Sequence, residues 1–541
     1  MLLFLKKKSE EEPGPAELPA AEQRTLHDYI PCHSHYNPHT LITKNGELMQ
    51  TIRIICNNEG LTYESGKNDG QTVHDYLRRA IAECITADHY ALWIHTIRKR
   101  KNVHYSGHFK DPFAMHVHEQ WKEKNRWKSQ YYNEIYVTIL REGMASNLFD
   151  KKTLGKSILP KLNRQHHHAY LAQATVEMDA VVAAVLSRIR AEYRAERLSI
   201  VERASGGGPA VFYSEPLEFF GTLLNLHTES IAVSDTDASK QISTHSLVFG
   251  FNALETKSPS GHRRFGAMLS LKQYREVPPE SADRLLQFPV EFILSQAFVF
   301  CPARRVLKEY KSQNDIFQVS GDTYSGGASG LDEMLKSDKG NPTDFGQMQT
   351  TVLVLADEYK HIDEEVTKVQ EAFGDMGLIT VREDVKLEEC FWAQLPGNFE
   401  FIRRKDDVNT ARIAGFTRLN LFPDGNDRGN HWGEAVTLLP TQANSPYFFN
   451  FHHQDNGHTL LFDFNSFRDN TAQVLLNFLL TSALKYDGRL FVFDRHQSAY
   501  LWCDKIHGRY HTFAPGNRRR TKNTLHLNPF SLPDEKRNRS F

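Results

Sequence analysis

The chain has 541 residues, of which 40% are hydrophobic and 24% are charged. At roughly 150 residues per domain this length predicts about two to four domains, and the composition excludes a wholly disordered or collagen-like protein. The formal net charge is −1, from 65 lysines and arginines against 66 acidic residues, so no global field attracts the chain to nucleic acid or anionic lipid. The six cysteines form no Cys-x-x-Cys pair, which indicates reduced thiols rather than a disulfide framework.

Residues 1–24 are rich in acids, Pro and Ala and have no apolar period, which predicts a disordered leader. The apolar residues 2–5 precede three lysines, the reverse of the order in a signal peptide, so we expect no secretion signal. The most apolar stretches, such as 289–301, contain polar residues and fall short of the roughly 20 apolar residues that span a bilayer. We therefore expect any membrane contact to be made through partners.

Residues 25–430 alternate between strand-like and helix-like patterns. In chain order, periodicity predicts strand 47–55, helix 72–86, strand 90–97, helix 169–189, strand 351–356, helix 362–373 and strand 378–381. The last three elements form a β-α-β unit. We predict an α+β N-terminal domain with ferredoxin-like split β-α-β elements, followed by a turn-rich linker that ends at Asn430.

Residues 431–541 begin a second domain. Strands are predicted at 447–452 and 458–462, on either side of an Asp-Asn-Gly turn. A polar loop, a helix at 472–486 and a strand at 489–493 follow. The order strand, loop, helix, strand is typical of the opening of a phosphate-binding α/β domain.

The loop after the strand 458–462 is where a nucleoside triphosphatase carries glycines, a lysine and a hydroxyl residue for phosphates and Mg²⁺. Here residues 463–471 contain no glycine and no lysine. A carboxylate about 5 Å from a phosphate costs roughly 3 kcal/mol at an effective dielectric near 20. We predict a degenerate phosphate loop that does not bind nucleotide in the usual way, with a weak or partner-completed site as the alternative. Its candidate residues are Asp463, Asn465, Ser466, Arg468, Asp469, Asn470 and Thr471.

Other acidic candidates fit structural roles better than catalytic ones. Asp357 and Glu358 follow an apolar strand but precede the loop in the chain, whereas the acidic strand of P-loop enzymes follows it. Asp494 ends the strand 489–493 and is assigned a structural role. We assign no catalytic residue.

Metal and nucleic-acid sites are also disfavoured. The histidines at 33–39, 166–168 and 452–453 lack the spacing and the carboxylate or thiolate partners of a metal site. The glycine-rich stretch 320–330 has no Lys-Ser/Thr pair and is predicted to be a mobile loop rather than an anion cradle. The basic runs 98–101 and 518–522 lack interleaved aromatic residues, so we favour solvated faces over specific DNA binding.

Four stretches together resemble a known family. They are FWAQLPGN at 391–398, HWGEAVT at 431–437, SPYFFNFH at 445–452 and GHTL at 457–460. In this order they closely resemble the type IV secretion and conjugation ATPases, the CagE/TrbE/VirB component family. The resemblance runs from about Ile30 to the LNPF stretch at 527–530 and so covers nearly the whole chain.

The resemblance implies an N-terminal domain that docks on the secretion channel's inner-membrane complex. It also implies a C-terminal RecA-like domain that hydrolyses ATP with Mg²⁺ and assembles into rings. The family's phosphate-loop Gly, Lys and Thr fall between residues 463 and 473, where this chain has neither Gly nor Lys. The family's acidic strand and later strands have no counterpart before Phe541, so we expect the RecA-like domain to be incomplete.

The leading hypothesis is a cytoplasmic subunit of a type IV secretion system, at the cytoplasmic face of the bacterial inner membrane, that acts by docking with impaired or absent hydrolysis. Its expected partners are inner-membrane and cytoplasmic channel subunits, including a full-length ATPase paralogue, in a homo- or hetero-oligomer. The alternative is a functional ATPase whose site is completed by a missing C-terminal segment or a partner chain. ATP and Mg²⁺ are its cofactors only if the family activity is retained. A third hypothesis is a nucleic-acid-binding coupling protein.

Overall fold

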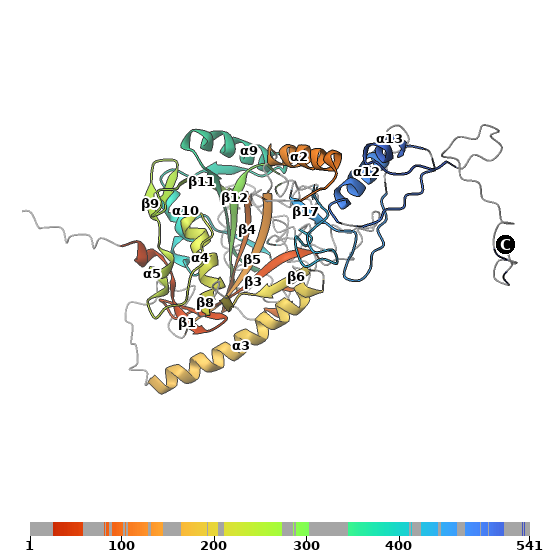
Figure 1. The fold of residues 1–541 in the computed structure, drawn as a ribbon. Helices are drawn as coiled ribbons and strands as arrows, with labels where there is room; N and C mark the ends of the chain where they lie inside the picture. Colours follow the sequence, from red (N-terminus) through yellow and green to blue (C-terminus); the bar gives the residue numbers. More distant parts are fainter. Residues whose placement is uncertain are drawn as a thin grey trace, which may run out of the picture. The chain divides into compact units, whose positions relative to one another are not determined.

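The structure is a computed structural model (Figure 1). It describes residues 25–57, 80–81, 83–85, 89–100, 103, 107–127, 131–143, 164–191, 193–203, 210–272, 285, 288–301, 345–409, 413, 424–441, 445–462, 471–486, 488–495, 497–512, 533 and 535. The predicted leader, the glycine-rich stretch 320–330 and most of the predicted helix 72–86 lie outside these residues. The chain forms two compact units, one of Met1–Arg98 with Asn133–Asn420 and one of Lys99–Tyr132 with Leu421–Phe541.

The first unit contains a large sheet of thirteen described strands, which pair antiparallel. Its main path runs β1-β2-β3-β5-β4-β12-β13-β11-β10-β9, with β6 beside β3, β15 beside β13 and β14 beside β11. The strands are β1 (Cys32–Asn37), β2 (Thr40–Thr43), β3 (Leu48–Asn57), β4 (Tyr90–Arg100), β5 (Tyr131–Arg141), β6 (Tyr193–Arg197), β9 (Ser246–Phe249), β10 (Leu254–Lys257), β11 (Arg263–Leu271), β12 (Glu291–Phe300), β13 (Phe345–Ala356), β14 (Thr380–Arg382) and β15 (Asp406–Asn409).

The centre of this sheet is β12, which is buried at every position and pairs with β4 and β13. The apolar stretch 289–301 is therefore the middle strand of a sheet, which explains its apolar residues without a bilayer. Alternation of side chains gives each strand two faces. On β3, Met49 belongs to the hydrophobic core cluster, whereas the next residue, Gln50, donates a hydrogen bond to Asp179 of helix α3 (Arg164–Arg190).

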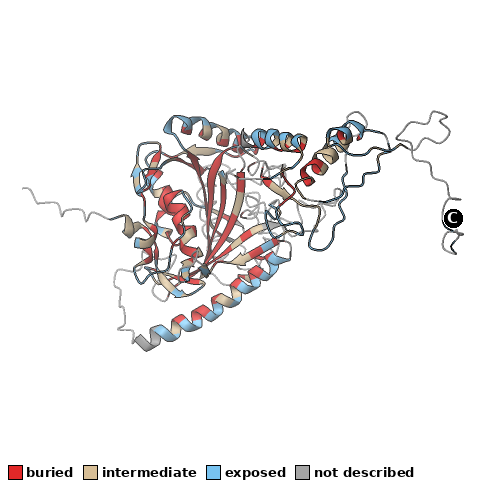
Figure 2. Ribbon diagram, in the orientation of Figure 1, coloured by how far each residue is buried: buried red, intermediate tan, exposed pale blue. Residues whose placement is uncertain are grey.

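The core cluster lies between the sheet and the helices α4 (Glu215–Asn225), α5 (Ala238–Ile242) and α10 (Leu387–Ala393). Figure 2 shows α4 buried along most of its length. Ser214 is the N-cap of α4, and its hydroxyl accepts a hydrogen bond from the backbone N–H of Leu217 at 3.1 Å. A short β7–β8 hairpin (Ile200–Arg203 and Val211–Ser214) leads into this helix.

Helix α3 packs its apolar face, with Met178, Val182 and Val185 buried, against β3 and β6. Among the described helices, its segment His168–Arg190 is the one long and apolar enough to meet the criteria for a membrane span. A core-facing amphipathic helix meets the same criteria, and the contacts of α3 with the sheet are of that kind.

The predicted strands 47–55, 90–97 and 351–356 are confirmed as β3, β4 and β13, and the predicted helix 362–373 is α9 (Ile362–Asp375). The predicted β-α-β unit is β13, α9 and β14. Within β11, Leu269 pairs with Val352 of β13 on one side and with Arg382 of β14 on the other. The two strands of the unit are thus parallel to each other with β11 between them.

The second unit contains α2 (Pro112–Trp127), the hairpin of β16 (Thr437–Pro440) and β17 (Pro446–Phe449), α12 (Thr471–Ala483) and α13 (Tyr500–Lys505). Helix α2 comes from within the predicted N-terminal domain but clusters with residues 421–541. The indole N–H of Trp121 donates to the carbonyl of Leu438 at 2.7 Å, and its ring lies 4.7 Å from that of Phe478. These contacts attach α2 to the β16–β17 hairpin and to α12.

The second unit departs from the predicted strands. The strand 447–452 is shortened to β17, which pairs with β16 and not with 458–462. The tight turn forms at Gln454, with φ +54°, between the bridged residues His453 and Asn456. The runs 458–462 and 489–493, called here the two apolar runs, are described but are not strands. The prediction was wrong there because a strand needs a hydrogen-bonding neighbour, and neither run has one among the described residues.

Candidate functional site

The predicted phosphate loop is represented in the described part of the chain by Thr471 alone, which is exposed at the first position of α12. Asp463, Asn465, Ser466, Arg468, Asp469 and Asn470 lie outside the described residues. The helix that should follow the loop is present as α12, which confirms the predicted helix 472–486 in position. The role of the loop residues stays a prediction.

The end of α12 is held by the HWGEAVT stretch at 431–437. The Tyr486 hydroxyl donates to the carbonyl of Glu434 at 2.5 Å, and the Lys485 ammonium group donates to the carbonyl of Ala435. Burial lowers the pKa of Lys485 to about 8. The Trp432 ring lies 5.1 Å from the ring of Tyr486, so this family-like stretch anchors the helix that follows the loop.

Two histidines of the second unit stack on each other rather than point at a common ligand. The rings of His431 and His452 lie 4.2 Å apart and nearly parallel, and Trp432 packs edge-on against His452. In the first unit, His33 pairs with Asp237 and His35 bonds the Ser214 hydroxyl. Among the residues that the structure describes, no group of three or more His, Cys, Asp or Glu side chains could hold a metal ion.

The FWAQLPGN stretch at 391–398 builds the core of the first unit. The Trp93 indole donates to the carbonyl of Ala393 at 3.1 Å, and the ring nitrogen Nε2 of His95 lies 2.8 Å from the carbonyl of Gln394. The Asn398 amide donates to the carbonyl of Tyr29 at 2.9 Å, which ties α10 to the start of the described chain. These residues are buried, so the role of this stretch is to pack the core.

The acidic candidates occupy structural positions. Asp357 pairs with Arg264 at 3.4 Å, and Glu358 pairs with Lys360 at 2.6 Å, which lowers the pKa of Glu358 through a hydrogen bond. Asp494 accepts hydrogen bonds from the backbone N–H of Ala499 at 2.7 Å and from the hydroxyl of Tyr510 at 3.2 Å. Asp494 therefore organises the turn before α13.

The first arginine of the basic run 98–101 is not exposed to solvent. Arg98 is buried, and its guanidinium donates to the carbonyl of Phe288 at 2.6 Å and to the amide oxygen of Asn133 at 2.9 Å. This side chain holds the sheet together and is not presented to a phosphate backbone. The second basic run, 518–522, lies outside the described residues.

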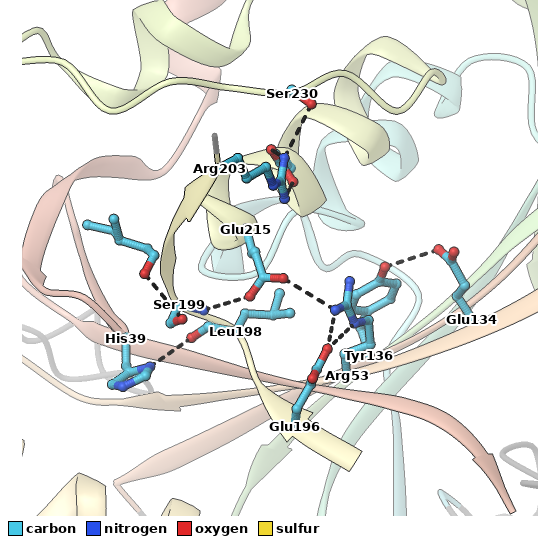
Figure 3. Close-up of polar contacts among 12 residues, drawn as sticks. His39, Arg53, Glu134, Tyr136, Glu196, Leu198, Ser199, Arg203, Glu215 and Ser230 are labelled. Carbon is cyan, nitrogen blue, oxygen red and sulfur yellow. Dashed lines mark hydrogen bonds and ion pairs between the residues drawn. The ribbon is translucent and has the colours of Figure 1, made fainter. Parts of the chain in front are cut away.

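An ion-pair network that the sequence did not reveal joins β3, β6 and α4 (Figure 3). Arg53 of β3 donates to Glu196 of β6 at 3.0 Å and to Glu215 of α4 at 3.3 Å. The second oxygen of Glu215 accepts the backbone N–H of Ser199 at 3.1 Å. Burial and the nearby Glu134 raise the pKa of Tyr136, whose hydroxyl donates to that carboxylate at 3.0 Å.

Both carboxylates that face Arg53 in this network pair with its one guanidinium, and Glu218 pairs with Arg203 at 2.6 Å. The network therefore fixes α4 against the sheet. Its residues lie 143 and 162 positions apart in the chain, so no local pattern could have predicted it.

Two family descriptions match separate parts of this chain. Residues 204–404 match the CagE, TrbE, VirB family, described as a component of type IV transporter system, and residues 39–147 match the N-terminal domain of the type IV secretion system ATPase VirB4/TrbE. The first match contains the core-building stretch 391–398.

Several relatives match nearly the whole chain. It is 29% identical to the type IV secretion system protein virB4 of Bartonella henselae, over 90% of this chain and 60% of that protein. It is 24% identical to the type IV secretion system protein PtlC of Bordetella pertussis, over 96% of this chain and 63% of that protein. It is 25% identical to the virB4 protein of Brucella melitensis, over 94% of this chain and 61% of that protein. The chain thus spans 60 to 63% of the length of these relatives. The two family matches lie in separate regions and agree with relatives that match nearly the whole chain, and together they support a member of the type IV secretion ATPase family.

Proposed function

We propose that this chain is a docking or assembly subunit of a type IV secretion system, at the cytoplasmic face of the bacterial inner membrane, with impaired or absent nucleotide hydrolysis. The observation that carries the proposal is the composition of residues 463–471, which include no glycine and no lysine but two aspartates. Backbone N–H groups close on phosphates where glycines permit it, and a lysine neutralises the charge. Arg468 is the one cation among residues 463–471. The same loop contains the carboxylates of Asp463 and Asp469.

The first unit supports a docking role because the family-like residues there build a packed core. The split arrangement of β13 and β14 around β11, with α9 as the connection, is the kind of element that a ferredoxin-like domain contains. Its expected partners are inner-membrane and cytoplasmic subunits of the channel, including a full-length ATPase paralogue. For the second unit, we propose an incomplete RecA-like domain, in which the run 458–462, the loop, α12 and the run 489–493 keep the order of its opening elements.

The nucleotide part of the proposal is tested by titrating a fluorescent ATP analogue with Mg²⁺ onto the full chain. We expect no saturable change in polarisation up to about millimolar nucleotide, a range that corresponds to about −4 kcal/mol of binding free energy. Arg468→Ala and Asp469→Ala are measured in parallel. Micromolar binding that Arg468→Ala abolishes would show that the loop still holds phosphate, and the proposal of a lost site would then be wrong.

The docking part is tested separately, by fractionating cells that contain a type IV secretion system and express the tagged chain. We expect the chain to sediment with the inner membrane and to become soluble when the channel's inner-membrane subunits are deleted. Equal sedimentation in both strains would contradict docking on those subunits, whatever the nucleotide result.

A second candidate function is that of an ATPase whose site is completed by a C-terminal segment or a partner chain. The observation that favours it is the exposure of the two apolar runs in the second unit, where Phe462 is 74% exposed and Phe493 is 97% exposed. Under this alternative, ATP hydrolysis is absent in the chain alone and is detected on addition of the completing polypeptide. The same mixing experiment without any gain in hydrolysis favours the docking subunit.

A further inference from the structure

The chain contains two Asn-Gly dipeptides, and their surroundings differ. Asn45–Gly46 lies between β2 and β3 of the first unit, and Asn456–Gly457 follows the tight turn of the second unit at Gln454. Both asparagines are exposed to solvent. Because glycine has no side chain, the carboxamide of a preceding asparagine can approach the glycine nitrogen. The two dipeptides therefore have the same intrinsic chemistry, and the folded chain decides which of them reacts.

The carboxamide of Asn456 is held over the backbone that follows it. Its oxygen Oδ1 accepts the backbone N–H of His458 at 3.1 Å, which is the hydrogen bond of an Asx turn. This turn brings Cγ of Asn456 toward the nitrogen of Gly457. The same N–H donates to the oxygen that gains negative charge when that nitrogen attacks Cγ, as an oxyanion-hole donor does.

The backbone nitrogens of the two glycines also differ. The N–H of Gly46 donates to the carbonyl of Thr43 at 3.0 Å, within a hairpin that the backbone bond from Thr43 to Glu47 closes. In the part of the chain that the structure describes, the N–H of Gly457 donates to no acceptor. An amide nitrogen becomes a nucleophile when a base removes its proton, so a hydrogen bond to a carbonyl protects Gly46 and not Gly457.

The imidazole ring of His452 lies against Gly457. A Cβ built on Gly457 would lie 2.7 Å from Nε2 of His452, and the His452 ring stacks on that of His431 at 4.2 Å. Histidine is the side chain that most often serves as a general base. His452 is thus placed beside the residue whose N–H must lose its proton.

We infer that Asn456 is a site of intramolecular deamidation, and that its hairpin protects Asn45. The nitrogen of Gly457 attacks Cγ of Asn456, and its proton passes to Nε2 of His452. The C–N bond of the carboxamide then breaks, the proton returns to the leaving nitrogen, and ammonia departs from a succinimide ring. Water opens this ring at either carbonyl and leaves aspartate or isoaspartate at position 456. The reaction needs no nucleotide and no partner, so its test is independent of the proposed function.

The products change the turn in two ways. Each adds a negative charge next to Asp455. Isoaspartate also lengthens the backbone by one methylene group, within the bridge in which His453 and Asn456 exchange backbone hydrogen bonds of 2.9 and 3.0 Å. We therefore expect hydrogen exchange of the peptide that contains this turn to become faster as the modified form accumulates.

The test is incubation of the full folded chain at neutral pH, followed by peptide mass spectrometry at intervals. Replacement of the amide by a hydroxyl gives the mass change, and labelling by an isoaspartyl methyltransferase detects isoaspartate. We expect the peptide with Asn456 to convert at least about tenfold faster than the peptide with Asn45. In the chain unfolded by urea the two rates should be similar. Equal rates in the folded chain, or the same difference in the unfolded chain, overturns the inference.

Matched variants test the base. His452→Phe keeps a ring to stack on His431 but cannot accept a proton, so it should slow conversion of Asn456 by at least about tenfold. If His452 only supported the turn, its loss would leave the rate unchanged or raise it. His453→Phe is the control, because it changes the adjacent exposed histidine and leaves the His452 ring in place. The control should convert as the unchanged chain does, and equal rates in the two variants overturn the role of His452.

Discussion

The first unit and the second unit use apolar strands of similar composition with opposite results. In the first unit β12, EFILSQAFVF, is buried at every position between β4 and β13. In the second unit the run RLFVF at 489–493 exposes every residue. Strand propensity is similar in the two sequences, so the difference comes from the neighbours that each segment finds. A pleated apolar segment becomes a strand when at least one of its edges is paired, and β12 is buried because both of its edges are paired.

The largest expected difference between the units comes from the same substitution made in each. Phe292 of β12 is 1% exposed, and Phe292→Ala should lower the free energy of unfolding by about 3–5 kcal/mol, through lost burial and the cavity it leaves. Phe493→Ala should change it by less than about 0.5 kcal/mol, because that ring already contacts water. Urea unfolding followed by peptide-resolved hydrogen exchange measures each unit separately. A similar loss in both variants would mean that the run 489–493 is covered in the isolated chain.

The comparison also shows what the sequence could and could not predict. The buried strands of the first unit and helix α9 follow from periodicity, because their patterns are local and their neighbours lie within the same chain. The antiparallel order that places β4 beside β12 joins segments about two hundred residues apart, and no local pattern encodes it.

The candidate site is less predictable than the fold. The absence of Gly and Lys in 463–471 is read directly from the sequence. It indicates that this loop lacks the residues that usually bind phosphate. The structural roles of Arg98 and Asp494 depend on partners that only the folded chain brings together. The Arg53 network is of the same kind, since three elements must meet before its charges are paired.

A pH change should destabilise the first unit through a buried histidine. Burial lowers the pKa of His95 from its usual 6.5 to about 4. Between these values the unfolded chain binds more protons than the folded one, so stability falls as the pH falls through this window. At about pH 4.5 the loss relative to about pH 7 should be about 2–3 kcal/mol from this group.

His95→Gln is the variant that isolates the effect, because glutamine is neutral across the window and keeps a donor for the carbonyl of Gln394. Urea unfolding of the unchanged chain and of the variant near both pH values gives the difference. If the variant loses as much stability on acidification as the unchanged chain, the buried histidine is not the group responsible.

A backbone substitution in the core-building stretch should have a smaller effect. Gly397 has φ +102°, and a Cβ there would lie 3.2 Å from the Cβ of Pro31. Gly397→Ala should therefore cost about 2 kcal/mol in the first unit. Gly374→Ala, within α9 and with no atom within 4 Å of the new methyl group, should stabilise by about 0.5–1 kcal/mol. Thermal unfolding of the two variants checks the opposite signs, and two changes of the same sign would contradict this account.

The smallest predicted effect tests whether α2 belongs to the second unit. Trp121→Phe removes the hydrogen bond to the carbonyl of Leu438 but keeps a ring against Phe478, so it should cost about 1 kcal/mol. The loss should be seen in hydrogen exchange of the peptides from β16 and α12, while peptides from β12 exchange as before. Because α2 is inserted between β4 and β5 in sequence, faster exchange in β12 instead would mean that α2 stabilises the first unit. In that case the segment 99–132 would belong to the sheet that flanks it, and the apolar face of α12 would join the two apolar runs as surface that needs a partner.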